Sequence, residues 1–211
     1  MKVPAVASAL LLGLAACSQP AETVTHDLAT APADAFLAAI AAHCGQAYEG
    51  KVVQDTPAPT GKDPFAGQRL VMHVRGCADP AHELRIPFHV GDDHSRTWVL
   101  TRTPTGLRLK HDHRHQDGSA DAITLYGGDS TPPGTAGRQQ FPADADSVAM
   151  FRRADMLAST HNTWAMEIDP DQTFVYELTR PDGRRFRVQF DLAKPVDLPP
   201  PPWGDEASPA R

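Results

Sequence analysis

The sequence predicts an all-β domain, an antiparallel up-and-down β-barrel preceded by one short helix. Roughly nine short segments rich in β-branched or aromatic residues follow one another along the chain. Gly, Pro and Asp turn signals join several of them at hairpin spacing, which indicates antiparallel neighbours. The last segment, residues 185–192, alternates apolar and polar side chains, as a strand with one buried face does.

The domain is expected to open with a helix over residues 35–43. Asp34 is the expected N-cap, and Gly45 follows as a stop signal. The apolar positions fall at helical spacing: Phe36, Leu37 and Ile40.

The expected strands then follow in hairpin order. They are residues 48–55, 69–75, 83–90, 96–102, 107–115, 122–126, 163–168, 173–179 and 185–192. Tight turns are expected at 103–106, 116–119, 169–171 and 181–183. Residues 127–142 are rich in Gly and Pro and predict a loop, and residues 145–157 predict a second helix.

A twisted antiparallel sheet of this size buries its apolar face by closing on itself or by doubling over. We therefore expect an up-and-down barrel, with a two-sheet β-sandwich or a jelly roll as the alternative. The opening helix, the meander and the length resemble the lipocalin-like barrels of the calycin group. The Gly-x-Trp signature of that group is replaced by the segment from Gly45 through Tyr48 to Gly50, which lacks the tryptophan.

The first 17 residues predict a secretory signal peptide. Lys2 precedes an uncharged apolar run of about twelve residues, which is too short to span a bilayer as a helix. The segment Leu14-Ala15-Ala16-Cys17 resembles the bacterial lipobox. That resemblance implies that Cys17 becomes the lipidated first residue of a membrane lipoprotein, with acyl chains such as palmitate. Ser18, where Asp would signal retention in the inner membrane, implies the periplasmic face of the outer membrane. Ordinary secretion with Ala-x-Ala cleavage is the alternative.

Composition divides the rest of the chain. Residues 18–33 are rich in Ala, Thr and Pro and predict a flexible tether. Residues 34–194 form the expected barrel domain, and residues 195–211 form a Pro-rich tail of extended character. The net charge of −6 comes from interspersed acidic and basic residues, which excludes nucleic acid as an expected partner.

Three cysteines are present. If Cys17 holds lipid, Cys44 and Cys77 remain, and in an oxidising compartment we expect them to form a structural disulfide. A redox-active pair and two metal thiolates are the alternatives.

One local cluster suggests metal chemistry. His111, His113 and His115 alternate along a predicted strand, so they would project from one face, which continues the apolar face of Leu107 and Leu109. Converging imidazoles bind transition metals such as zinc or copper. The alternative is a solvated strand end.

Two other histidines lie on predicted strands. His73 and His89 have the parity opposite to their apolar neighbours, so we expect them to face outward.

Aromatic side chains are spread over the predicted strands and could line a lipophilic pocket or form plain core. They are Phe88, Trp98, Trp164, Phe174, Tyr176, Phe186 and Phe190. No nucleophile elbow, phosphate loop or dinucleotide motif is present, so the sequence favours a non-enzymatic role and nominates no catalytic residue.

The function predicted is therefore an envelope-anchored barrel that binds a small apolar ligand or a metal ion. One alternative is a structural lipoprotein that engages an envelope protein without a ligand. The other is a metal-dependent enzyme that uses His111 and His113.

Overall fold

The structure is a computed structural model that describes residue 1 and residues 31–205, except 59, 62, 132 and 133. The predicted signal peptide, Cys17 and most of the tether lie outside the described residues. No helix in the described part is long and apolar enough to cross a membrane.

Two α-helices, one 3-10 helix and ten strands make up the described residues. They are α1 (Pro32–Ala41), β1 (Ala47–Thr56), β2 (Leu70–His73), β3 (Glu83–Val90), β4 (Asp93–Thr103), β5 (Gly106–His113), β6 (Tyr126–Asp129), β7 (Arg138–Pro142), α2 (Ala145–Arg153), η1 (Leu157–His161), β8 (Thr163–Asp169), β9 (Thr173–Thr179) and β10 (Arg185–Val196).

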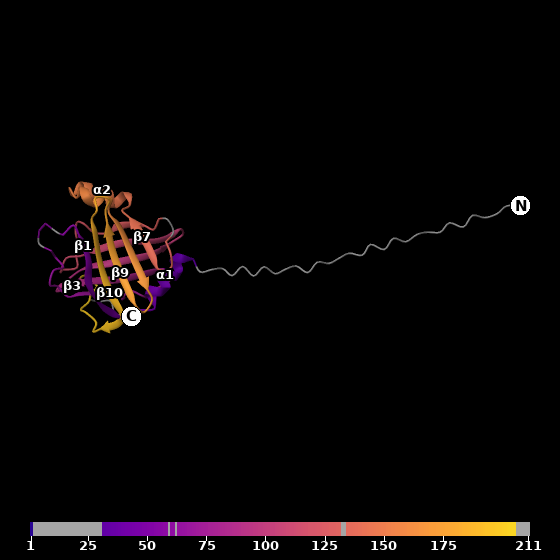
Figure 1. Cartoon of the computed structure of the whole chain (residues 1–211), viewed down its shortest axis with the longest axis horizontal. Coiled ribbons are helices and arrows are strands. Elements are labelled where there is room, and N and C mark those ends of the chain that lie inside the picture. The colour runs from indigo at the N-terminus through magenta and orange to yellow at the C-terminus, as the bar shows by residue number, and fades with distance from the viewer. Residues whose placement is uncertain (2–30, 59, 62, 132–133, 206–211) are drawn as a thin grey trace.

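The strands form one antiparallel sheet in the order β6-β5-β4-β3-β2-β1-β10-β9-β8-β7. The first strand pairs with the last, with Lys51 opposite Gln189. The sheet curls until its two end strands, β6 and β7, meet, so the barrel is nearly closed. Figure 1 shows its front wall with β1, β10 and β9, and α2 at the top. The predicted all-β up-and-down barrel is confirmed.

Two glycines let β6 approach the segment between β7 and α2. A Cβ on Gly128 would lie 1.9 Å from the carbonyl oxygen of Pro142. The Asp144 amide donates to the Gly127 oxygen at 2.8 Å, and the Ser147 hydroxyl also bonds to Gly127. A side chain at position 128 would therefore hold this seam open, and one at position 127 would collide with the Leu109 carbonyl oxygen of β5.

The interior follows the predicted alternation. Phe186, Val188, Phe190 and Leu192 of β10 are buried in the core cluster. Helix α1 adds the side chains of Phe36, Leu37 and Ile40 to the same core.

The predicted disulfide between Cys44 and Cys77 is present, with a Cα–Cα distance of 6.2 Å. It ties the turn after α1 to the segment after β2.

The start of the first helix differs from the prediction. It begins at Pro32, and Ala31 is its N-cap without a side-chain hydrogen bond. Proline suits the first helical turn because its missing N–H has no partner there in any case. Asp34 lies inside the first turn and pairs instead with Arg102 of β4.

The middle of the chain also differs. Residues 138–142, expected in a loop, form strand β7 along β8, with Gln140 opposite Ala165. Strand β6 covers 126–129 rather than 122–126, and α2 ends at Arg153 before the separate turn of η1.

The tail is packed against the barrel as far as it is described. Val196 still lies opposite Ala47 on β1, and the Trp203 amide donates to the His94 oxygen on β4 at 3.0 Å. Residues 202–205 line a cavity together with Arg85 and Pro87 of β3. We call residues 197–205 the strap.

The outward orientation expected for two histidines is found, but their exposure to solvent is not. His73 and His89 have the predicted outward parity, opposite to core residues Met72 and Phe88. They are nevertheless only 1% and 2% exposed, because this part of the outer wall is covered.

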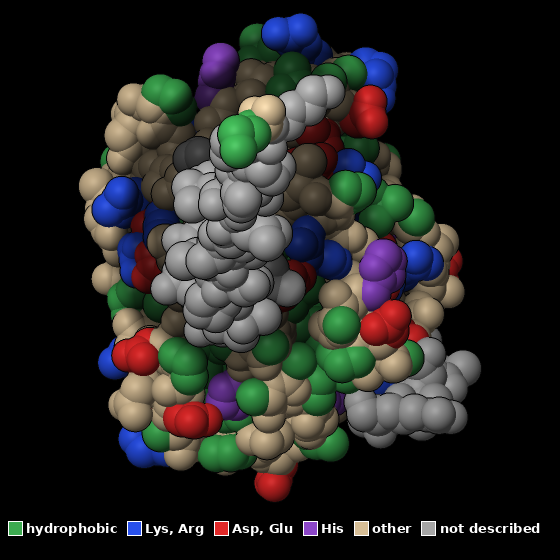
Figure 2. Space-filling model, turned by 90° about the vertical axis from the view of Figure 1, so that its right-hand side faces the viewer, with side chains coloured by type: hydrophobic (Ala, Val, Ile, Leu, Met, Phe, Trp, Pro, Cys, Tyr) green, Lys and Arg blue, Asp and Glu red, His purple; other side chains and the backbone are tan. Residues whose placement is uncertain are grey.

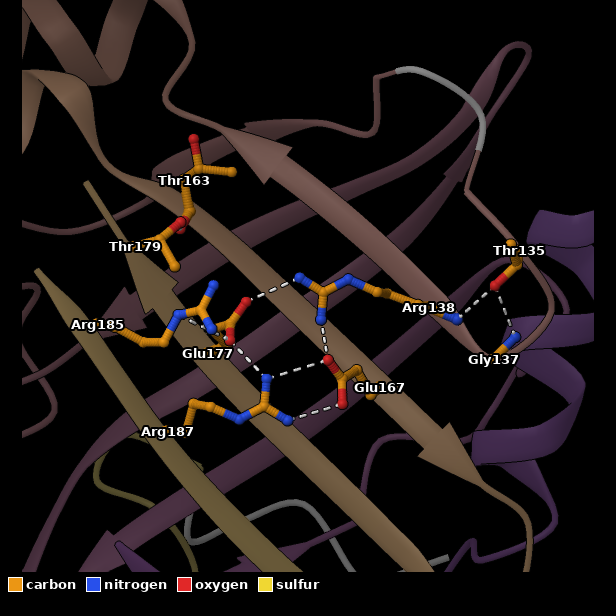
Figure 3. Close-up of polar contacts among 9 residues, drawn as sticks. All are labelled: Thr135, Gly137, Arg138, Thr163, Glu167, Glu177, Thr179, Arg185 and Arg187. Atoms are coloured by element: carbon orange, nitrogen blue, oxygen red, sulfur yellow. Dashed lines mark hydrogen bonds and ion pairs between the residues drawn. The ribbon is translucent and has the colours of Figure 1, made fainter. Parts of the chain in front are cut away.

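On the opposite wall, β7 to β10 present a charged outer face. Glu167 and Glu177 lie among three arginines, Arg138, Arg185 and Arg187, in one network of ion pairs (Figure 3). Figure 2 shows acidic and basic side chains interspersed on the face it views, without a large area of one sign.

Candidate functional site

Two adjoining cavities open at the end of the barrel that α2 and η1 cover. The first, of about 170 Å³, we call the aromatic cavity; the second, of about 330 Å³, reaches Phe151 of α2 and Ser159 of η1. They share their lining at four side chains, which are His113, Tyr126, Tyr176 and Leu178. The site is therefore built by β5, β6 and β9 at one end of the barrel.

The aromatic cavity has walls of stacked rings. Trp98 stacks on Tyr176 with 4.5 Å between ring centroids and on Phe88 with 4.9 Å. Phe65, from the loop after β1, packs 4.7 Å from Phe186 and completes the wall. Large flat apolar surfaces of this kind are typical of sites for small organic molecules.

His111 forms the polar floor of this cavity. Its Nδ1 lies 3.1 Å from the Tyr126 carbonyl oxygen, which can only accept, so Nδ1 carries the proton. Its Nε2 therefore accepts from the Tyr176 hydroxyl at 2.8 Å. Burial lowers the pKa of His111 to about 3 against the opposing effect of the Tyr126 hydrogen bond, so the ring stays neutral. Burial also raises the pKa of Tyr176, so its hydroxyl keeps the proton that it donates.

His113 and Tyr126 form a second polar pair at the junction of the two cavities. The His113 Nε2 and the Tyr126 hydroxyl are 3.0 Å apart. Burial, with a smaller contribution from Arg96, lowers the pKa of His113, and burial raises the pKa of Tyr126 to about 12. Both groups are neutral near pH 7 and can exchange hydrogen bonds with a neutral polar ligand group.

Two arginines complete the lining. Arg96 lies opposite His113 on β4 and pairs with Asp93 at 2.7 Å. Arg184 pairs with Asp55 and lies 5.8 Å from the centre of the Phe186 ring. Both charges are balanced, so the cavity favours a ligand that is polar at one end rather than a strongly charged one.

The three predicted metal-ligating histidines are not all together. His111 and His113 line the aromatic cavity, as their parity predicted, but β5 ends at His113 and His115 is exposed in the following loop. Both nitrogens of His111 are already hydrogen bonded. In the part of the chain that the structure describes, no group of three or more His, Cys, Asp or Glu side chains is arranged to hold a metal ion.

The predicted aromatic set divides between pocket and core. Phe88, Trp98, Tyr176 and Phe186 line the aromatic cavity, and Trp164 lines the adjoining one. Phe174 and Phe190 are fully buried in the core.

Sequence reasoning missed six residues that line the aromatic cavity, which are Phe65, Arg96, Thr97, Tyr126, Leu178 and Arg184. Arg96 shares the inward parity of Trp98 on β4, so the alternation of that strand could have found it. Tyr126 stood at the end of a predicted strand, and Phe65 stood in a segment without periodicity.

Comparison of the chain with protein family models, with curated protein sequences and with solved structures finds no match, so the functional argument depends on the residues of this site.

Proposed function

We propose that the protein is a binding module whose aromatic cavity takes a small, single-ring apolar ligand with one hydrogen-bonding group. The observation that supports this proposal is the aromatic cavity of about 170 Å³, which is lined by Trp98, Tyr176 and Phe88. A buried apolar cavity of about 150 Å³ is large enough to hold benzene. One ring therefore fits this space, and a larger ligand needs the adjoining cavity as well.

The polar side of the cavity sets the ligand's orientation. The His113–Tyr126 pair offers a neutral donor and acceptor at one end. A hydroxyl or carbonyl substituent would bond there while its ring lies against the aromatic side chains that line the cavity. Hydrogen bonds in such a dry site discriminate strongly between ligands, because a missing partner leaves a buried polar group unpaired.

The proposal includes the setting of the barrel. On the resemblance of residues 14–17 to a lipobox, Cys17 would hold the chain to the periplasmic face of the outer membrane. Replacement of Cys17 by Ala is then expected to move the protein from the membrane fraction to the soluble fraction.

Binding is tested by calorimetric titration of the domain with phenol and with benzene. Leu178 lines both cavities, so Leu178→Phe should fill the space and raise the dissociation constant for both probes at least about tenfold, which corresponds to about 1.4 kcal/mol. The matched control is Leu157→Phe, since Leu157 is 60% exposed on η1. Equal binding by the two variants, or no saturable binding of either probe, would refute the site.

A second variant tests the orientation. Tyr126→Phe removes the hydroxyl and keeps the ring, so it should weaken phenol binding about tenfold and leave benzene binding within twofold. Equal losses for both probes would show that the hydroxyl does not orient the ligand.

The metal-ion alternative keeps a separate test. Elemental analysis of the untagged domain, compared with a variant in which His111, His113 and His115 are all Ala, distinguishes it. Near-stoichiometric zinc or copper in the unaltered domain, and its loss in the variant, would favour a metal-binding function. Its ligands would require His111 to give up at least one of its two hydrogen bonds. The ligand-free interaction alternative would be favoured by a crosslinked envelope partner together with no binding of either probe.

A further inference from the structure

A polar cavity of about 330 Å³ lies between the strap and the outer wall of the barrel, separate from the aromatic cavity. Outward-facing side chains of β3, β4 and β5 form one side of it, and Pro202, Trp203, Gly204 and Asp205 of the strap form the other. Outer barrel faces are ordinarily solvated, so a roofed cavity in this position is a built feature of the chain.

Three guanidinium groups from separate segments line this strap cavity. Arg75 follows β2, Arg85 belongs to β3 and Arg114 follows β5. Arg75 is buried, with 7% of its side chain exposed, whereas Arg85 and Arg114 are 40% and 38% exposed. Arg75 thus lies at the floor, and the other two lie where solvent enters.

Three carboxylates contact these guanidinium groups. Asp205 of the strap accepts from Arg75 at 3.2 Å. Asp112 alone is shared between Arg85 at 3.1 Å and Arg114 at 3.3 Å, and its side chain is 6% exposed. Glu83 also bonds to Arg85 but does not line the cavity. Three carboxylates thus face three guanidinium groups, and Asp112 is the one that Arg85 and Arg114 share.

The two outer arginines also have unused hydrogen-bonding capacity. A guanidinium has five N–H donors. Within the described residues, Arg85 bonds to Glu83 and Asp112, and Arg114 bonds to Asp112 and the Gly118 carbonyl. Donors of both groups remain for an acceptor placed between them.

We propose that the strap cavity is a second binding site, for a small soluble molecule that bears an oxyanion, a phosphate or a carboxylate. The oxyanion lies between Arg85 and Arg114, because guanidinium groups bind carboxylates and phosphates with paired hydrogen bonds. The volume exceeds that of the anion alone, so a small polar body lies beside Trp203. The strap closes one side of the site, so bound ligand ties the tail to the barrel wall.

The experiment is a calorimetric titration of the domain, residues 18–211, with sodium phosphate and with sodium citrate, each against sodium chloride of equal ionic strength. Saturable binding of at least one of the two anions beyond the chloride reference is expected. The double variant Arg85→Gln/Arg114→Gln should raise the dissociation constant at least tenfold. The matched control is Arg108→Gln, because Arg108 has the same outward parity on β5 but pairs with Asp129 and is absent from the cavity lining. It should bind within twofold of the unaltered protein.

A second measurement needs no variant. Backbone amide resonances of Ser95, Asp112 and Trp203, which line the strap cavity and not the aromatic cavity, should shift with added phosphate or citrate along a saturating curve. Resonances of Thr173 and Glu177 on the opposite wall should stay in place. The absence of saturable binding for both anions, or equal binding by the double variant and the control, would overturn the proposal.

Discussion

The two outer walls of the barrel bury polar side chains in opposite ways. On the wall of β7 to β10, Glu177 is nearly inaccessible but accepts hydrogen bonds from Arg138 and Arg187. On the wall of β2 and β3, His73 and His89 are equally buried, and none of their four ring nitrogens has a partner among the described residues. Burial of the Glu177 carboxylate is therefore tolerated because hydrogen-bond donors surround it. Burial of the two imidazoles without partners lowers the free energy of unfolding.

The difference appears in the titration of these groups. Burial alone would raise the pKa of Glu177, but the hydrogen bonds from Arg138 and Arg187 outweigh it and lower the pKa. Burial lowers the pKa of His73 to about 4 and that of His89 to about 3, and nearby positive groups such as Arg75 act in the same direction. The wall of β7 to β10 therefore keeps Glu177 ionised, and the wall of β2 and β3 keeps His73 and His89 neutral.

The largest effect is expected from Glu177→Gln. Loss of the carboxylate charge leaves Arg138, Arg185 and Arg187 with only Glu167 as an acidic partner in this network, at a cost of about 3 kcal/mol in the free energy of unfolding. Urea unfolding at pH 7 measures it. Asp191→Asn, on the same wall in an exposed pair with Lys194, is the control and should change nothing measurable. Similar stabilities for the two variants would mean that this network contributes little.

The next effect depends on pH. His89 has a folded-state pKa of about 3 and an unfolded value near 6.5, so the unfolded chain binds the proton first as the pH falls. Stability is lost below pH 6.5 by up to about 1.4 kcal/mol per pH unit, or about 2 kcal/mol at pH 5. His89→Leu removes this loss, so its unfolding free energy should fall less than that of the unaltered protein between pH 7.5 and pH 5.

The control for this experiment is His115→Leu, since His115 is exposed in the loop after β5. It should follow the unaltered protein at every pH. Parallel curves for His89→Leu and the unaltered protein would show that the buried imidazole does not set the acid sensitivity.

A smaller effect is expected at the strap itself. Trp203→Ala removes a ring whose centroid lies 6.4 Å from that of the His94 ring. The free energy of unfolding should fall by about 1 kcal/mol. It should also speed amide hydrogen exchange at position 203, whose N–H bonds to the His94 oxygen. Leu198→Ala, at a strap residue that is 52% exposed, should leave that exchange rate unchanged. Equal exchange in both variants would mean that the Trp203 ring does not hold the strap.

The fold could be predicted where the pattern is local. The strict alternation of Phe186, Val188 and Phe190 was enough to identify β10 and its inward face. Strand β7 was missed because Gln139 and Pro142 interrupt any alternation, and the segment becomes a strand only by pairing with β8. Gln139 is 1% exposed, and its amide donates to the Thr135 oxygen at 2.8 Å, a partner that no propensity reveals.

The candidate site could be predicted in part for the same reason. The parity of His111 and His113 on one strand identified two lining residues, but the end of β5, and hence the place of His115, depends on tertiary contacts. The strap could not be predicted, because Trp203 finds its partner His94 far back along the chain.

The pairing of β1 with β10 also affects how the chain reaches this fold. Gly50 lies opposite Phe190, 140 residues later in the sequence. As the polypeptide is synthesised from its N-terminus, β1 has one unsatisfied edge until nearly the whole chain has emerged. Contacts of such sequence separation form slowly, and an exposed strand edge pairs readily with other chains. A chain that stops before residue 185 lacks β10, so it cannot join the two halves of the barrel and should aggregate rather than persist as a shortened soluble form.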